Sequence, residues 1–162
     1  MLRMTMYRFQ AGDMVGAVET YTTALSLPLV SHRHPVILTN RSAAFASMGR
    51  WKEALSDCNV ALALWPLFSR AATRRATCLF NLNRLEEARD QYVLLIEENP
   101  FDDSLQKSLH EVEMSIRKAE MEQLGARALE LCQSGKVHTI TKHEEWSGVL
   151  VAAWNRLIIV AA

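Results

Sequence analysis

The sequence predicts an all-α fold in which three helix-turn-helix units stack on one another and end in a capping helix. Three segments of the chain align in register, and equivalent positions in the second and third segments lie 34 residues apart, as Gly49 and Asn83 or Pro66 and Pro100 show. After the third segment, apolar residues recur at intervals of three and four, which is the spacing of one helix face.

Each aligned segment has the residues that a tight helical hairpin needs. A residue that accepts the left-handed backbone of a helix end begins each segment, at Gly12, Gly49 and Asn83. Five residues later comes an alanine, which lets two helices cross closely; these residues are Ala17, Ala54 and Ala88. Larger side chains are predicted to fill the surrounding holes, namely Tyr21, Phe45, Trp51, Leu79 and Tyr92.

The linkers and the end of the stack follow from prolines and polar residues. The first linker is three residues longer than the second, and residues 28–35 are predicted to form a loop because prolines stand at both ends. Asp103 and Gln106 predict a capping box. The helix that follows is predicted to cover the stack with a stripe of Leu105, Leu109, Val112, Ile116 and Ala119. Beyond Lys118 the stripe shifts, so the helix is expected to leave the stack there.

This pattern resembles the tetratricopeptide repeat (TPR), whose period is about 34 residues, over residues 2–120. The resemblance implies a helical solenoid whose concave side is lined by the first helix of each unit and binds peptides. An ordinary helical bundle would require the same glycine, alanine and proline pattern to recur by coincidence.

The resemblance also implies candidate binding residues, because related domains hold the acidic C-terminal tails of heat-shock chaperones with Lys, Asn and Arg side chains. The matching positions are Asn40 in the second unit and Arg70 and Arg74 in the third. The two arginines are four residues apart on one helix face, so both can bond carboxylates. The first unit departs from the pattern with Leu2 and Met6, so weaker binding is expected. The alternative, that both arginines are merely solvated like Arg75, stays open.

Residues 134–162 resemble the beginning of a thioredoxin domain. A strand at residues 137–140, a helix at 144–153 and a strand at 156–160 are expected, a short incomplete βαβ tail. The chain ends before the Cys-x-x-Cys motif of that family, so we expect a truncated form similar to the plant fusions of TPR and thioredoxin domains. The predicted domains are therefore a TPR domain with its capping helix at 1–133 and a thioredoxin-like segment at 134–162.

Composition excludes several classes of function. Eighteen basic and eighteen acidic residues cancel, so no net charge attracts nucleic acid or a membrane surface, and no signal peptide or membrane-spanning segment is predicted. The cysteines Cys58, Cys78 and Cys132 form no Cys-x-x-Cys pair, which favours reduced thiols in the cytoplasm. The histidines lack cysteine partners, and no catalytic motif occurs, so we predict no metal, no cofactor and no enzyme.

The predicted function is a co-chaperone-like adaptor that binds the C-terminal peptides of heat-shock chaperones or other acidic peptide tails. Two alternatives stay open. The first alternative is a member of the TPR-thioredoxin oxidoreductases that is redox-inactive in this form. The second is a folded protein that has lost its function.

Overall fold

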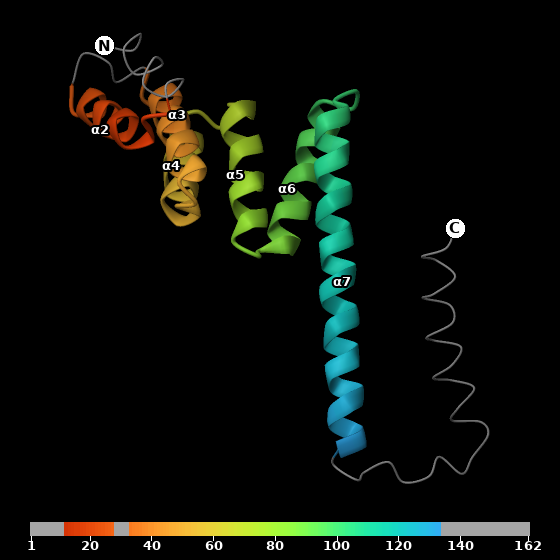
Figure 1. The fold of residues 1–162 in the computed structure, drawn as a ribbon. Coiled ribbons are helices and arrows are strands. Elements are labelled where there is room, and N and C mark those ends of the chain that lie inside the picture. Colours follow the sequence, from red (N-terminus) through yellow and green to blue (C-terminus); the bar gives the residue numbers. More distant parts are fainter. Residues whose placement is uncertain (1–11, 28–32, 134–162) are drawn as a thin grey trace. The chain divides into compact units, whose positions relative to one another are not determined.

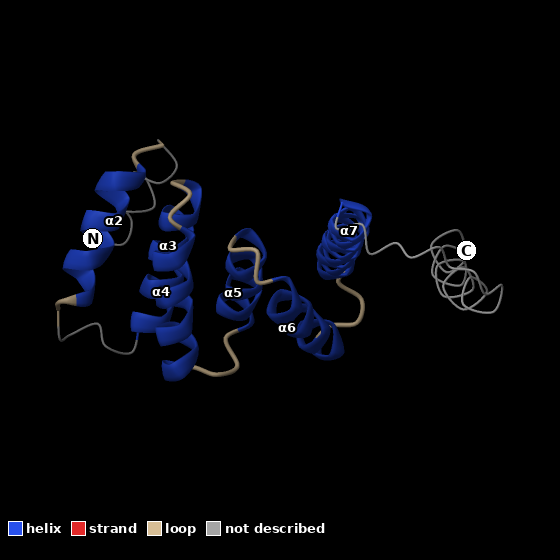
Figure 2. Cartoon of the chain, turned by 90° about the horizontal axis from the view of Figure 1, so that it is seen from below, coloured by secondary structure: helices blue, strands red, loops and turns tan. Residues whose placement is uncertain are grey.

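The computed structural model describes residues 12–27 and 33–133, with side chains as far as residue 127. These residues form six helices, and none of them lies in a strand (Figures 1 and 2). The helices are α2 (Met14–Leu25), α3 (His34–Ser47), α4 (Trp51–Leu64), α5 (Ser69–Asn81), α6 (Leu85–Glu98) and α7 (Asp103–Gln133). The all-α prediction is confirmed for this part of the chain. The predicted thioredoxin-like segment, residues 134–162, and the predicted domain boundary before it lie at or beyond the end of the described residues.

The predicted turn residues have the backbone conformation that their sequence positions required. Gly12, Gly49 and Asn83 have φ angles of 81°, 72° and 59°. At the second and third of these turns, equivalent hydrogen bonds close the end of the preceding helix. In the second turn Arg50 N donates to Phe45 O at 2.9 Å, and in the third Arg84 N donates to Leu79 O at 3.0 Å. Asn83 therefore performs the task of a glycine, since asparagine tolerates the left-handed region better than most residues do.

Successive helices pack against one another in chain order. Helix α2 contacts α3, α3 contacts α4, α4 contacts α5, and α5 contacts α6. In addition α3 contacts α5, although α4 lies between them in the sequence. The first helices of the second and third repeat units are thus neighbours, and this adjacency creates the candidate site.

The core contains the predicted alternation of small and large side chains. Ala17, Ala54 and Ala88 have no exposed surface, which agrees with their predicted place at the helix crossings. Of the predicted large side chains, four are buried and Trp51 packs against the core while remaining partly exposed; the buried four are Tyr21, Phe45, Leu79 and Tyr92. Removing a large side chain from such a core would leave a cavity that the rigid crossings could not close.

The start of two helices differs from the sequence prediction. The expected capping box at Asp103 and Gln106 was wrong: Asp102 caps α7, accepting a hydrogen bond from Ser104 N at 2.9 Å. The Gln106 amide instead donates to the Pro100 carbonyl at 2.9 Å. Helix α3 begins within the predicted loop, at His34, with Pro35 in its first turn. Proline is tolerated there because the first amides of a helix have no partner within it.

Helix α7 contributes to two compact units, residues Met1–Arg117 and Lys118–Ala162. In the first unit, Leu105 and Val112 are buried in the same core cluster as Tyr92 and Leu79, and the partly buried Leu109 and Ile116 pack against that cluster. In the second unit, the apolar side chains of Met121 and Leu124 are 65% and 48% exposed. The predicted apolar stripe thus covers the repeats as far as Ile116.

Candidate peptide-binding site

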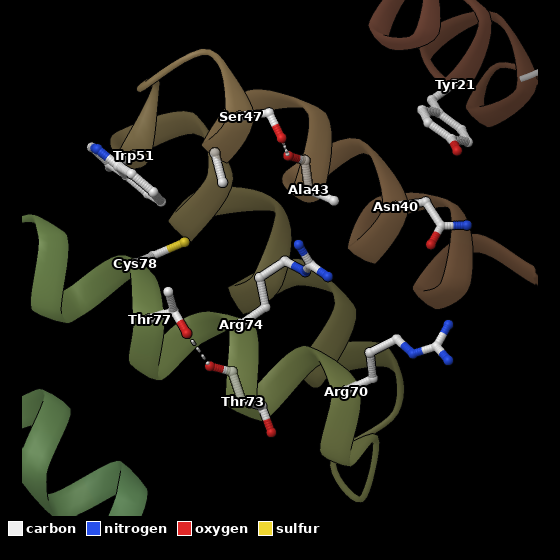
Figure 3. Close-up of a pocket in the computed structure, with 11 residues that line it drawn as sticks. Tyr21, Asn40, Ala43, Ser47, Trp51, Arg70, Thr73, Arg74, Thr77 and Cys78 are labelled. Carbon is white, nitrogen blue, oxygen red and sulfur yellow. Dashed lines mark hydrogen bonds between the residues drawn. The ribbon is translucent and has the colours of Figure 1, made fainter. Parts of the chain in front are cut away.

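A cavity of about 650 Å³ lies between α3 and α5, with contributions from α2 and α4. The residues that α3 and α5 contribute recur every three or four positions, so each helix presents one face to the cavity. From α3 these residues include Asn40, Ala43 and Ser47, and from α5 they are Arg70, Thr73, Arg74, Thr77 and Cys78 (Figure 3). The contact between α3 and α5 is what brings the two faces together.

The three predicted binding residues all line this cavity. Asn40 extends from α3, while Arg70 and Arg74 project from successive turns of α5 toward the same space (Figure 3). Asn40 and Arg74 are partly buried, and Arg70 is exposed. The two positions where related domains have Lys and Asn, Leu2 and Met6, lie outside the described residues.

Arg74 has a buried hydrogen-bond donor without an acceptor. Its Nε is shielded from solvent and has no hydrogen-bond partner among the described residues. In this part of the chain neither Arg70 nor Arg74 forms an ion pair or a side-chain hydrogen bond, and the same holds for Asn40. A buried donor without a partner costs free energy, and an anion entering the cavity would recover that cost.

Arg41, next to Asn40 in the sequence, has a different environment. Its Nε and Nη2 donate to the two carboxylate oxygens of the buried Asp57, at 2.8 and 2.7 Å. Its Nη1 donates to Thr22 Oγ1 at 3.0 Å, and its guanidinium lies 5.7 Å from the centre of the Phe45 ring. With its donors engaged by α2 and α4, Arg41 holds three helices together and is not available to a ligand.

Apolar side chains form other parts of the cavity wall. Tyr21 reaches it from α2 and Trp51 from α4, and Ala46 adds apolar surface from α3. Burial raises the pKa of Tyr21, which keeps its hydroxyl protonated. The sequence placed Tyr21 and Trp51 only as core residues. Their role in the wall could not be read from their spacing, because it arises from the packing of α2 and α4 around α3 and α5.

The described residues contain neither a metal-binding cluster nor a membrane-spanning helix. There, no three His, Cys, Asp or Glu side chains gather closely enough to hold a metal ion. Nor does any described helix combine the length and apolar character that crossing a bilayer requires.

Comparison with known proteins agrees with this architecture. Residues 45–111 match the sequence family of the tetratricopeptide repeat. The chain is 37% identical over 113 residues to sperm-associated antigen 1 of Mus musculus, covering 69% of this chain and 12% of that protein. It is 31% identical over 112 residues to RNA polymerase II-associated protein 3 of Rattus norvegicus, covering 69% of this chain and 16% of that protein. The chain thus spans a small part of these relatives.

One solved structure resembles this chain over most of the length of both. The first TPR domain of Spaghetti (RPAP3), bound to the HSP90 peptide SRMEEVD, matches with a TM-score of 0.66 and 28% identity, covering 71% of this chain and 89% of that chain. The described helices therefore have the fold of a TPR domain.

Proposed function

We propose that this chain is a non-catalytic adaptor that binds the acidic C-terminal tail of a heat-shock chaperone between α3 and α5. The observation that carries the proposal is the convergence of Asn40, Arg70 and Arg74 on one cavity, with a buried Arg74 donor that lacks an acceptor. The peptide in the similar Spaghetti structure, SRMEEVD, ends in an aspartate, whose carboxylates can accept hydrogen bonds from such donors.

A C-terminal aspartate offers two carboxylates on one residue. Arg70 and Arg74 would supply charge-assisted hydrogen bonds to them, and the Asn40 amide would add a neutral donor. The partly buried position of Arg74 strengthens its bonds, because fewer water molecules compete for the guanidinium there. The more exposed Arg70 would attract the tail and contribute less to its affinity.

The first repeat unit is expected to limit the affinity. Where related domains have Lys and Asn, this chain has Leu2 and Met6. Each hydrogen bond to a charged group contributes about 1.5–3 kcal/mol, so their loss would weaken binding by ~3 kcal/mol, or ~100-fold. Replacing Leu2→Lys together with Met6→Asn should recover at least ~10-fold in affinity, measured by calorimetry. No gain in affinity would count against a binding site that extends into the first repeat unit.

We place this function in the cytoplasm. The free and buried thiols of Cys58 and Cys78 support a reducing compartment. The thioredoxin-like character of residues 134–162 remains a hypothesis drawn from the sequence. Because that segment has no Cys-x-x-Cys motif, the purified chain should not reduce insulin with dithiothreitol. Turnover comparable to that of thioredoxin would favour the oxidoreductase alternative.

The decisive residue is tested by a matched pair of substitutions on α5. Arg74→Ala should weaken binding of the SRMEEVD peptide by about 1.5–3 kcal/mol in isothermal titration calorimetry. Arg75→Ala is the control, since Arg75 is its neighbour on the same helix but is not part of the cavity wall. It should change the affinity by less than ~0.5 kcal/mol. Equal effects of both substitutions would show that only general positive charge attracts the peptide.

A further inference from the structure

The turns that follow the second and third repeat units each expose a large apolar side chain. Leu67 follows Pro66 in the turn after α4. Phe101 follows Pro100 in the turn after α6, 34 residues later in the chain. Leu67 is 81% exposed and Phe101 is 97% exposed, so neither side chain adds much to the core of this chain. Both turns lie at the same end of α5 and α6, opposite the turn that joins these two helices (Figure 1).

Two hollows beside these turns share a wall residue. The first, of about 330 Å³, lies between the turn after α4 and the helices α5 and α6, and its wall includes Leu67, Leu94 and Glu98. The second lies at the turn after α6, and its wall includes Glu98 and Phe101. Leu94 is 54% exposed and precedes Glu98 by one turn on the same face of α6. The hollows therefore form one surface, which we call the turn face; it consists of Leu67, Leu94, Glu98, Phe101, Asp102 and Asp103.

The turn face is acidic around its apolar side chains. Glu98, Asp102 and Asp103 are exposed, and none of them forms an ion pair with a residue that the structure describes. Arg75 lines the first hollow, but one cation does not balance three carboxylates. A contiguous apolar surface with an excess of negative charge favours a partner that is apolar and positively charged.

The composition of the turn face also limits the kind of partner. In a symmetric dimer the face would meet itself, and its three carboxylates would lie opposite the same three carboxylates of the second copy. A partner strand has no edge to join, because the described residues form helices and no strand. A helix satisfies its own backbone hydrogen bonds, so it can lay an apolar face on this surface without further backbone partners.

We propose that the turn face binds a basic amphipathic helix of a partner protein. The apolar side chains of that helix would enter the hollow between Leu67 and Leu94 and cover Phe101. Its Lys or Arg side chains would bond Glu98 and Asp102. The turn face shares no wall residue with the cavity between α3 and α5, and the two sites have opposite charge. The inference thus goes beyond the proposed peptide binding and does not depend on it.

The test uses the full chain and a fluorescein-labelled peptide of about 18 residues, with leucine and lysine spaced so that one helix face is apolar and the other basic. Fluorescence anisotropy measures its affinity. Leu94→Ser with Glu98→Gln on α6 should weaken binding at least ~10-fold. The matched control is Val15→Ser with Glu19→Gln on α2, where Val15 is 62% exposed and the spacing is the same. The control should change the affinity by less than ~2-fold.

A second variant keeps the test valid if the α6 double variant loses its helical circular dichroism. Phe101→Ser leaves the core intact, because this side chain is almost fully exposed. It should weaken binding of the leucine-lysine peptide by ~3-fold or more. Raising the salt concentration should also weaken binding to the parent chain, because the carboxylates of the turn face are exposed.

Four results would overturn the inference. The first is that the peptide does not bind the parent chain. The second is an equal loss of affinity in the α6 and α2 double variants, or no loss in Phe101→Ser. The third is equal binding of a peptide with glutamate in place of lysine, because the turn face would then not select positive charge. The fourth is a dimer of the parent chain in sedimentation that Phe101→Ser abolishes, because a second copy would then occupy the turn face.

Discussion

Arg41 and Arg74 lie on neighbouring helices, and both are partly buried, yet their surroundings differ. Arg41 donates two hydrogen bonds to Asp57 and one to Thr22, which ties α2, α3 and α4 together. Arg74 faces the cavity with a buried Nε that has no acceptor in the described residues. The difference teaches that in a repeat array the partner of an arginine, more than its burial, separates a residue that holds the fold from one that can hold a ligand.

The largest loss of stability is expected when the ion pair between Arg41 and Asp57 is removed. Asp57→Ala removes the acceptor of a guanidinium that is only 19% exposed, so it should lower the free energy of unfolding by about 3 kcal/mol. Urea denaturation followed by circular dichroism measures this. A loss below ~1 kcal/mol would mean that water replaces Asp57 easily, and the contrast with Arg74 would fail.

The Arg74 side chain, in contrast, is expected to contribute little to the free energy of unfolding. Arg74→Ala should lower the free energy of unfolding by less than ~1 kcal/mol, because it removes no hydrogen bond and eliminates an unsatisfied donor. The same urea experiment applies. If Arg74→Ala destabilises the fold as much as Asp57→Ala does, Arg74 is a structural residue as well, and its loss of peptide affinity would need another explanation.

A subtler substitution separates charge from geometry. Arg74→Lys keeps the positive charge but loses the planar fork that bonds a carboxylate through two nitrogens. Peptide affinity should fall by about 1 kcal/mol, between the parent and Arg74→Ala, when titrated with SRMEEVD. An affinity equal to that of the parent would show that Arg74 acts only as a point charge.

The smallest effect is expected for an exposed ion pair. Arg89 donates to Asp90, its neighbour in the sequence, and both side chains are well exposed. Arg89→Ala should change the free energy of unfolding by less than ~0.5 kcal/mol, because solvent and salt screen this pair. The urea midpoint checks it, and a large loss would remove the distinction drawn between buried and exposed arginine pairs.

The fold was largely predictable because its determinants are local. Gly49, Asn83 and the crossing alanines each specify one turn or one close approach, and they recur at a fixed period. The predicted capping residue of α7 was wrong by one position, because Asp102 and Asp103 are adjacent and either carboxylate can cap a helix. Only the three-dimensional turn decides between them.

The site was predictable in part. The positions of Asn40, Arg70 and Arg74 on two helix faces follow from helical spacing and from the TPR resemblance, and the structure brings them to one cavity. The Arg41–Asp57 pair could not be predicted, because its members belong to different helices and neither has a distinctive sequence context.

The most direct test of the central claim is a double-mutant cycle between the arginines and the carboxyl terminus of the peptide. SRMEEVD with a free or an amidated C-terminus would be titrated by nuclear magnetic resonance into the parent chain and into the Arg70→Ala, Arg74→Ala double variant. We expect amidation to weaken binding to the parent at least ~10-fold and binding to the double variant less than ~2-fold. The same affinity ratio in both proteins would contradict carboxylate recognition by Arg70 and Arg74.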